Sequence, residues 1–109
     1  MNVRLYVAQR LTAALMVPLV VAHLAVIFYA TRHGLTAADV LARTRGSIAW
    51  AVFYWVFVAA AATHASIGIR TVLTEWSPLE GRSIDAAAAA FGLLLCVLGV
   101  RAVAAVVLP

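Results

Sequence analysis

Three long stretches of the chain contain no Asp, Glu, Lys or Arg, and short polar segments separate them. The stretches cover residues 11–31, 46–69 and 86–100, and beyond Arg101 the chain is apolar again to Pro109. About 20 apolar residues are enough for a helix to cross the hydrocarbon core of a bilayer. The pattern therefore predicts an all-α membrane protein with three transmembrane helices. We expect these helices at about residues 8–32, 46–75 and 84–108.

The composition agrees with this interpretation. Hydrophobic residues make up 66% of the chain and charged residues 11%, whereas a soluble domain has about 45–50% and about 25%. Almost no residues are left for a soluble domain, so we expect residues 1–109 to form a single transmembrane domain. The first apolar stretch follows Arg4 and Arg10 as a secretory signal would. Its 21 residues exceed the roughly 7–15 of such a signal, and we therefore expect it to be retained.

The net charge of +4 results from eight arginines and four acidic residues. The arginines are scattered around the predicted helix ends, where arginine usually anchors a helix at the membrane surface. We therefore expect these arginines to interact with the lipid bilayer and not with a nucleic acid. The arginines divide evenly between the two membrane sides, so charge alone does not decide the orientation. On the N-terminal side lie Arg4, Arg10, Arg70 and Arg82, and on the other side Arg32, Arg43, Arg45 and Arg101.

The two connections between the predicted helices are short. In residues 32–45, Thr36 precedes Asp39 by three positions, which is the spacing of a capping box, and this predicts a short surface helix up to Arg43. The second connection, residues 75–85, contains the turn-forming residues Pro78, Gly81 and Ser83.

Two histidines fall in the middle of predicted membrane helices, where ionisable side chains are costly and mark candidate functional sites. His64 lies 11 residues before Glu75, which corresponds to about 16 Å of helix. His23 lies 13 residues after Arg10, which corresponds to about 20 Å. A neutral imidazole is a common axial ligand of haem iron, and helix-bundle cores hold such sites. Both histidines are therefore candidate haem ligands.

Small residues surround His64. Residues 59–66 read AAAATHAS, and Gly68 follows His64 by four positions on the same helix face. Small side chains would let a flat macrocycle approach the helix backbone. They are also typical of close helix packing in membranes, with His64 hydrogen-bonded across the interface. The residues alone leave both interpretations open.

Polar and aromatic side chains gather at the membrane boundary nearest the N-terminus. Arginine and tryptophan are typical of any helix that ends among lipid headgroups. The same groups also suit an amphipathic ligand such as a quinone, whose carbonyl oxygens need hydrogen-bond donors at the membrane edge. The candidate residues for such a site are Tyr6, Arg10, Arg70, Glu75 and Trp76.

Two segments, HASIGIRTVLTEWSP at residues 64–78 and YVAQRLTA at residues 6–13, resemble motifs of one family of membrane proteins. The first resembles the second helix of the membrane-anchor (cytochrome b) subunits of succinate dehydrogenase and fumarate reductase. In that helix a histidine precedes a Gly-Ile-Arg-like step, an acidic-aromatic pair and often a proline. The second segment resembles the entry to the family's first helix. With three helices in the expected order, the resemblance covers nearly the whole chain, which would be half of a heterodimeric anchor helix bundle.

The resemblance implies a role for each candidate. His64 matches the axial ligand of haem b, which a histidine of a second membrane-anchor subunit usually completes. His23 is an addition to the single-haem pattern, and relatives with two haems imply that it ligates a second haem shared with that subunit. Arg10 matches the arginine of the quinone pocket. Glu75 and Trp76 match the Asp-Tyr pair beside that pocket, with Trp76 in place of the tyrosine.

The resemblance also implies electron transfer as the function. A flavoprotein subunit would oxidise succinate, an iron–sulphur subunit would pass the electrons on, and membrane quinone would receive them. The chain would thus be an enzyme subunit of the tricarboxylic acid cycle and the respiratory chain. It has no glycine-rich dinucleotide fingerprint, and we expect no dicarboxylate chemistry in this chain alone. The implied location is the inner (cytoplasmic) membrane, with the N-terminus in the cytoplasm and the C-terminus outside.

Two alternatives stay open at this point. A haem-free anchor of the same complex would need neither histidine as a ligand. A small non-redox membrane protein, such as a transporter subunit or a scaffold, would explain the three helices and the interfacial arginines. It would give no reason for two histidines at mid-membrane depth beside a layer of arginine and tryptophan.

Overall fold

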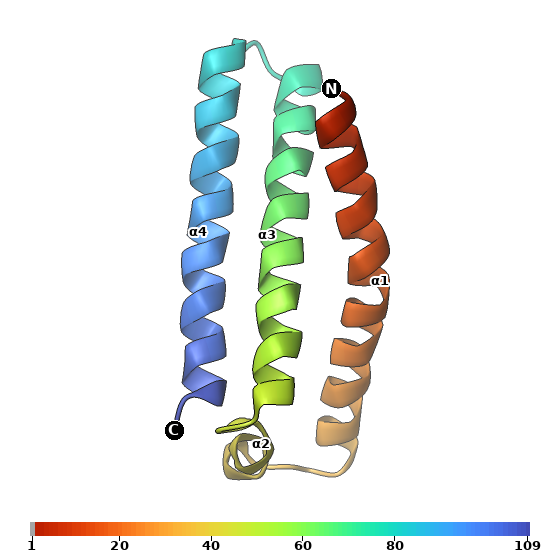
Figure 1. The fold of residues 1–109 in the computed structure, drawn as a ribbon, viewed down its shortest axis with the longest axis vertical. Helices are drawn as coiled ribbons and strands as arrows, with labels where there is room; N and C mark the ends of the chain where they lie inside the picture. The colour runs from red at the N-terminus through yellow and green to blue at the C-terminus, as the bar shows by residue number, and fades with distance from the viewer. Residues whose placement is uncertain (1) are drawn as a thin grey trace.

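The computed structural model describes residues 2–109, which form three long helices and one short one (Figure 1). The helices are α1 (Val3–Arg32), α2 (Ala37–Thr44), α3 (Ile48–Trp76) and α4 (Gly81–Val107). The helices α1, α3 and α4 are each long and apolar enough to cross a membrane. The prediction of an all-α protein with three membrane-spanning helices is confirmed.

Two helices begin earlier than the apolar pattern suggested. Helix α1 starts at Val3, because the side chain of Asn2 caps it by accepting a hydrogen bond from the Leu5 N–H at 2.9 Å. Helix α4 starts at Gly81, although its cap residue Glu80 makes no side-chain cap bond. The apolar stretches mark the part of a helix that lies in lipid, and the helix itself continues into the polar surface layer on either side. Arg10 therefore lies within α1.

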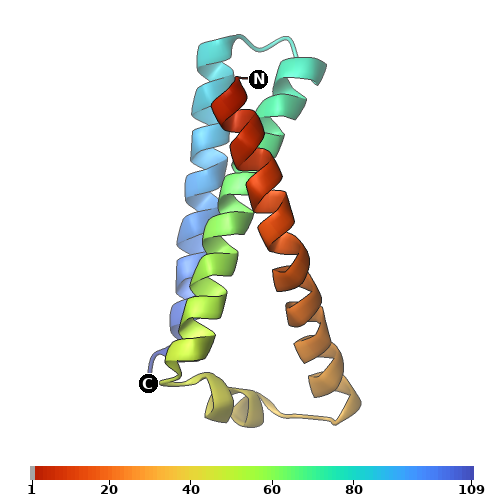
Figure 2. The same ribbon diagram turned by 45° about the vertical axis from the view of Figure 1, so that its right-hand side comes forward.

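The short surface helix predicted between the first two membrane helices is present as α2. Its capping box is complete: the Thr36 N–H donates to Asp39 Oδ2 at 2.8 Å, and the Asp39 N–H donates to Thr36 Oγ1 at 3.2 Å. The other end of α2 is tied to the end of α4. The Thr44 hydroxyl donates to the Val106 carbonyl at 2.6 Å, and the Gly46 N–H donates to the Val107 carbonyl at 2.8 Å. Helix α2 thus lies across one end of the bundle (Figure 2).

Helix α3 is the centre of the fold, since it packs against both α1 and α4 (Figure 1). Its contact with α4 is close, because small residues face it. A Cβ atom added at Gly99 would lie 2.5 Å from Val58 Cγ1, and one added at Gly92 would lie 3.0 Å from Ser66. The Ser66 hydroxyl also donates to the Ala88 carbonyl at 2.9 Å. Small residues and hydroxyl groups are the usual means of holding helices together in lipid.

The N-terminal part of α1 packs on α3, and the two helices diverge towards the end of the molecule where α2 lies (Figure 2). This arrangement leaves most large apolar side chains of α1 exposed. The apolar residues that are buried lie on α3 and α4. They are Ala60, Ala62, Ile67, Ile84, Ala88, Val103 and Val107.

Candidate functional site

His64 lies half-buried on α3, where it faces Thr12 of α1. The distance between His64 Nδ1 and Thr12 Oγ1 is 3.2 Å. The single hydroxyl proton of Thr12 has an acceptor within its own helix, since Oγ1 lies 2.8 Å from the Ala8 carbonyl. The Thr12 oxygen is then free to accept a hydrogen bond from His64 Nδ1–H. A neutral imidazole carries one N–H, so His64 Nε2 keeps its lone pair.

This arrangement has the features of a metal-binding histidine. Such a histidine usually donates its other ring N–H to a protein oxygen, which fixes both the tautomer and the orientation of the ring. Within residues 2–109 no hydrogen bond involves His64 Nε2. The sequence did not indicate Thr12 as the partner, because the two residues are separated by 52 positions and lie on different helices.

Gly68, four residues after His64 on the same face, is not required by packing within this chain. A Cβ atom added at Gly68 would meet only Gln9 Nε2, at an ordinary contact distance of 3.6 Å. Gly92 and Gly99 differ, since a Cβ there would come within 3.0 Å of its neighbours. The small residues of α3 therefore serve two purposes. Those that face α4 allow close helix packing, whereas Gly68 faces Gln9 of α1 without a tight contact.

His23 lies on α1 near the opposite end of the α1–α3 interface. Its ring meets the ring of Phe57 edge-to-face at 5.3 Å between centroids and that of Tyr54 at 6.0 Å. Phe57 precedes His64 by seven residues, so the two histidines are separated by about 10 Å along α3. His23 Nδ1 is buried and has no hydrogen-bond partner within residues 2–109. Unlike His64, His23 has no group that fixes its tautomer.

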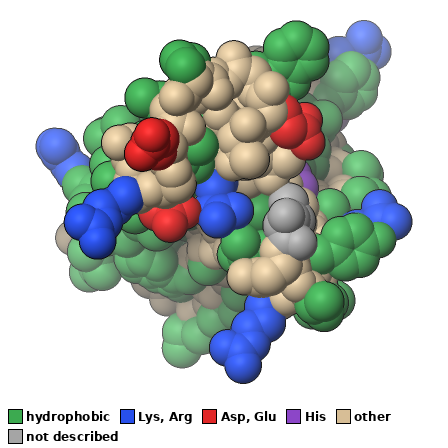
Figure 3. All heavy atoms as spheres, turned by 90° about the horizontal axis from the view of Figure 1, so that it is seen from above, with side chains coloured by type: hydrophobic (Ala, Val, Ile, Leu, Met, Phe, Trp, Pro, Cys, Tyr) green, Lys and Arg blue, Asp and Glu red, His purple; other side chains and the backbone are tan. Residues whose placement is uncertain are grey.

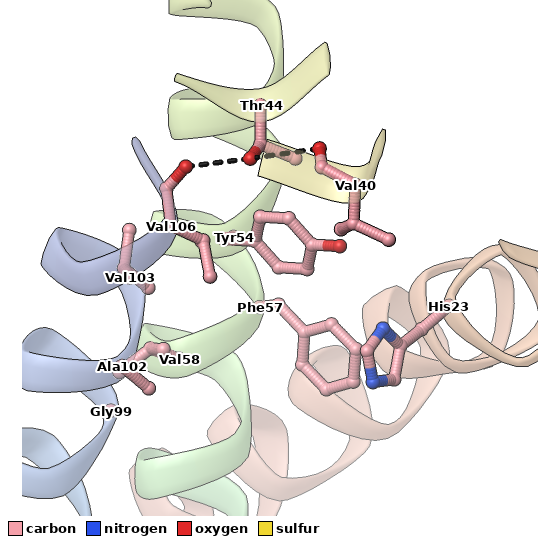
Figure 4. Close-up of a pocket in the computed structure, with 10 residues that line it drawn as sticks. All are labelled: His23, Val40, Thr44, Tyr54, Phe57, Val58, Gly99, Ala102, Val103 and Val106. Carbon is pink, nitrogen blue, oxygen red and sulfur yellow. Dashed lines mark hydrogen bonds between the residues drawn. The ribbon is translucent and has the colours of Figure 1, made fainter. Parts of the chain in front are cut away.

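A cavity of about 330 Å³ adjoins His23 (Figure 4). Most of the side chains around it are aliphatic, and the hydroxyl of Thr44 is occupied by its bond to Val106. His23 and Tyr54 supply the remaining polar atoms. The lining residues are His23 from α1; Val40 and Thr44 from α2; Tyr54, Phe57 and Val58 from α3; and Gly99, Ala102, Val103 and Val106 from α4.

The five candidate quinone residues lie at the end of the molecule that holds the N-terminus. Seen from that end, basic and acidic side chains surround the helix ends and apolar side chains form the flanks (Figure 3). The Arg10 guanidinium lies over the Tyr6 ring, 5.4 Å from its centroid. Glu75 is exposed, and Trp76 is 83% exposed. Within residues 2–109 no hydrogen bond or ion pair joins Arg10 to Glu75 or Trp76.

Arg70, the fifth of these candidates, is held by a partner that the sequence did not indicate. Its Nε donates to Asp85 Oδ1 at 2.9 Å, which links the ends of α3 and α4. The side chain of Arg70 is 34% exposed, and the bond to Asp85 leaves both terminal amino groups of the guanidinium available. Arg70 is therefore oriented by α4 while it keeps donors for a ligand.

Comparison with known families gives one result. Residues 1–106 match the profile of the family described as succinate dehydrogenase/fumarate reductase transmembrane subunit. Among curated proteins and among solved structures, none shows a significant match to this chain.

Proposed function

Because this chain belongs to the succinate dehydrogenase/fumarate reductase transmembrane subunit family, we propose that it holds haem b through His64 and forms part of a quinone site. It is a multi-pass membrane-anchor subunit of the succinate:quinone oxidoreductase family, and family membership implies association with the other subunits of that complex. The family sets aside the alternative of a non-redox transporter subunit or scaffold.

The haem assignment rests on the contact between His64 and Thr12. Haem b supplies a one-electron redox centre when it is bound. His64 Nε2 would be the axial ligand, and Thr12 would hold the ring in the tautomer that leaves this nitrogen unprotonated. Gly68, four residues after His64 on the same face, would add no side chain of its own beside the macrocycle. The second axial ligand would come from the second membrane-anchor subunit, with which this chain would form one helix bundle.

The quinone assignment rests on the donors at the N-terminal end. Arg10, steadied over the Tyr6 ring, and the terminal amino groups of Arg70 would donate to a quinone carbonyl. The indole N–H of Trp76 is a further donor. Reduction of a quinone to a quinol takes up two protons, and the exposed carboxyl group of Glu75 would pass protons from the aqueous side to the quinone oxygens. Arg10→Gln should lower kcat/KM for quinone about tenfold or more, because it removes a charged donor. Arg4→Gln, on the same helix, is the matched control and should leave this ratio unchanged.

We propose that the N-terminal end of the helices lies in the cytoplasm, against the iron–sulphur subunit. Electrons must pass from that subunit to a quinone, and the residues that would hydrogen-bond the quinone lie at this end. A protease-cleavable tag at Pro109 should then be cut in intact spheroplasts, and the same tag at the N-terminus should be protected. Cleavage of the N-terminal tag alone would reverse this orientation.

Spectroscopy of the purified complex tests the haem assignment. The reduced-minus-oxidised spectrum should contain a b-type band, and His64→Ala should remove it, while His33→Ala in the exposed connection should keep it. His23 as the ligand of a second haem stays a prediction of the sequence. If His23 ligates a second haem, a pyridine haemochromogen assay should find two haems per complex, and His23→Ala should remove one of them.

A haem-free anchor is the second candidate function. The same bond between Thr12 and His64 supports this candidate as well, because a hydrogen bond between helices is by itself a sufficient reason for a histidine in a membrane interface. In that case the wild-type complex would have no b-type band and would still reduce quinone. His64→Ala would then weaken the packing of α1 on α3 and leave the spectrum unchanged.

A further inference from the structure

Gln9, the one glutamine of the chain, lies half-buried on α1 where that helix faces α3. Its Oε1 is buried and has no hydrogen-bond partner within residues 2–109. Its Nε2 lies 3.6 Å from the position that a Cβ atom on Gly68 would occupy, and no hydrogen bond involves this nitrogen in the same part of the chain. An amide that leaves water without gaining a hydrogen bond is destabilising, so we expect its partner to come from outside the chain.

Gln9 stands at the border between two faces of α1. Thr12, three residues further along, belongs to the face that packs on α3, where it contacts His64. Tyr6 lies three residues before Gln9, and residues at this spacing are neighbours on a helix surface. The ring of Tyr6 carries the guanidinium of Arg10, and both side chains are exposed. A ligand that Arg10 binds is therefore adjacent to the amide of Gln9.

A quinone site needs hydrogen-bonding groups for two redox forms. Reduction adds two electrons and two protons, so a carbonyl oxygen that only accepts hydrogen bonds becomes a hydroxyl group that also donates one. The side chains of Arg10, Arg70 and Trp76 can only donate. Glu75 can accept, but it lies seven residues after Gly68, which is about 10 Å further out along α3. The deep end of the site therefore needs an acceptor for the quinol hydroxyl.

We propose that Gln9 is a specificity-determining residue of the quinone site proposed above, on which this inference rests. Its amide donates an N–H to a carbonyl oxygen of the quinone. After half a turn about its terminal bond, the amide accepts a hydrogen bond from the hydroxyl group of the quinol. Rotation about this bond has a broad energy profile, and neither amide atom has an internal partner that the turn would break. Gln9 thus binds both redox forms.

The unpaired oxygen selects a quinol over the carboxylate of a haem side chain. A carboxylate only accepts hydrogen bonds, so it would pair with Nε2 of Gln9 and leave Oε1 without a donor. A bound water would satisfy Oε1, and the affinity for quinone and quinol would then not depend on the amide.

Steady-state kinetics of the purified complex test the proposal. Succinate oxidation is measured with a ubiquinone that has a short saturated tail, and the corresponding quinol is added as product inhibitor. Gln9→Leu should raise the KM of the quinone and the inhibition constant of the quinol by a similar factor of about five, as the loss of one neutral hydrogen bond implies. Gln9→Met, which keeps the length of the side chain, should behave in the same way. Arg10→Gln should affect the quinone more than the quinol.

Infrared difference spectroscopy gives a readout that a merely structural role would not move. The quinone-minus-quinol spectrum of the complex should contain the carbonyl band of a glutamine side chain, because this carbonyl is hydrogen-bonded to the ligand in the quinol state alone. Labelling of glutamine with ¹³C should shift the band, and Gln9→Leu should remove it. The wild-type spectrum with and without the label needs no variant, so the test holds even if the variants fail to assemble.

Three results would overturn the proposal. These are unchanged constants in Gln9→Leu, the absence of a label-sensitive carbonyl band in the wild type, or a shift of the b-type band in Gln9→Leu with both constants unchanged, which would place the amide at the haem. A normal effect of Arg10→Gln beside an unaffected Gln9→Leu would contradict this inference alone. If neither variant changes either constant, the quinone site itself is wrong, and this inference is wrong with it.

Discussion

The two ends of the α1–α3 interface each contain a histidine, and the two side chains are held in different ways. His64 is bonded through Nδ1 to Thr12, which leaves Nε2 as the nitrogen available to a ligand. His23 rests against the rings of Phe57 and Tyr54, and its buried Nδ1 has no partner within residues 2–109. The first side chain is prepared for a ligand on one defined nitrogen. The second adjoins a cavity whose other lining residues come from α2, α3 and α4.

The difference arises from the distance between helices and not from the histidines themselves. Where α1 packs on α3, a hydroxyl on one helix reaches the imidazole on the other. Where α1 has diverged from α3 (Figure 2), His23 packs against the rings of Phe57 and Tyr54 and lines a cavity of about 330 Å³. Depth in the membrane is therefore a poor guide to whether a histidine is oriented in the way that metal-binding histidines are. The nature of the partner opposite each ring is the better guide.

The largest effect should come from removal of the partner of His64. Thr12→Val removes the oxygen that fixes the ring, and such second contacts are worth roughly 10–100-fold in metal affinity. Haem transfer from the purified complex to an acceptor apoprotein should become faster by that factor. Thr12→Ser keeps the hydroxyl and should behave as the wild type. A Thr12→Val complex that holds haem as tightly as the wild type would mean that the two histidines do not differ in this respect.

A smaller effect should come from disturbing the helix contact next to the His23 cavity. In Gly99→Ala the new methyl group meets the branched side chain of Val58, and overpacking of this kind costs about 1–3 kcal/mol. Thermal or urea unfolding in micelles measures the loss, with Gly81→Ala as the control because a Cβ there meets nothing within 4 Å. The b-type spectrum should be unchanged. A spectral change as large as the loss of stability would show that the two ends of the molecule are coupled.

The smallest effect concerns pH, and it should be confined to the His23 end. The backbone N–H of Thr36, and after it the Thr36 hydroxyl, lower the pKa of Asp39 below its usual value of 3.8. A lowered pKa means that the ionised carboxylate stabilises α2 above about pH 4 and that this contribution is lost as the pH falls through the lowered value. Amide exchange of α2 should therefore accelerate below that pH. Asp39→Asn should remove the pH dependence, and amides around His64 should not respond in either protein.

The sequence predicted the architecture well, because the cost of a charge in lipid makes each membrane helix visible as an uncharged stretch. It also predicted α2, because the spacing of Thr36 and Asp39 is specific to a helix start. It did not predict the contacts of Thr12 with His64 or of Arg70 with Asp85. A single helix pattern indicates which residues share a face and gives no information on which face of another helix lies opposite.

The start of α1 was missed for a related reason. Charge marks where lipid ends, and the Asn2 cap that begins the helix lies several residues further out. The divergence of α1 from α3 had no sequence signal either. Divergence is a property of how the helices pack on one another, which the pattern along one helix does not contain.

The small amount of apolar surface that this chain buries by itself has a consequence for its stability in the cell. Among residues 2–109 of the chain by itself, seven apolar residues are buried, and no large side chain is fully enclosed. Helix packing within such a subunit is weakly stabilised until the subunit associates with the other subunits of the complex. Membrane proteases recognise loosely held helices, so unassembled copies should be short-lived. The amount of the chain would then follow the supply of its companion subunits, whatever the rate of its own synthesis.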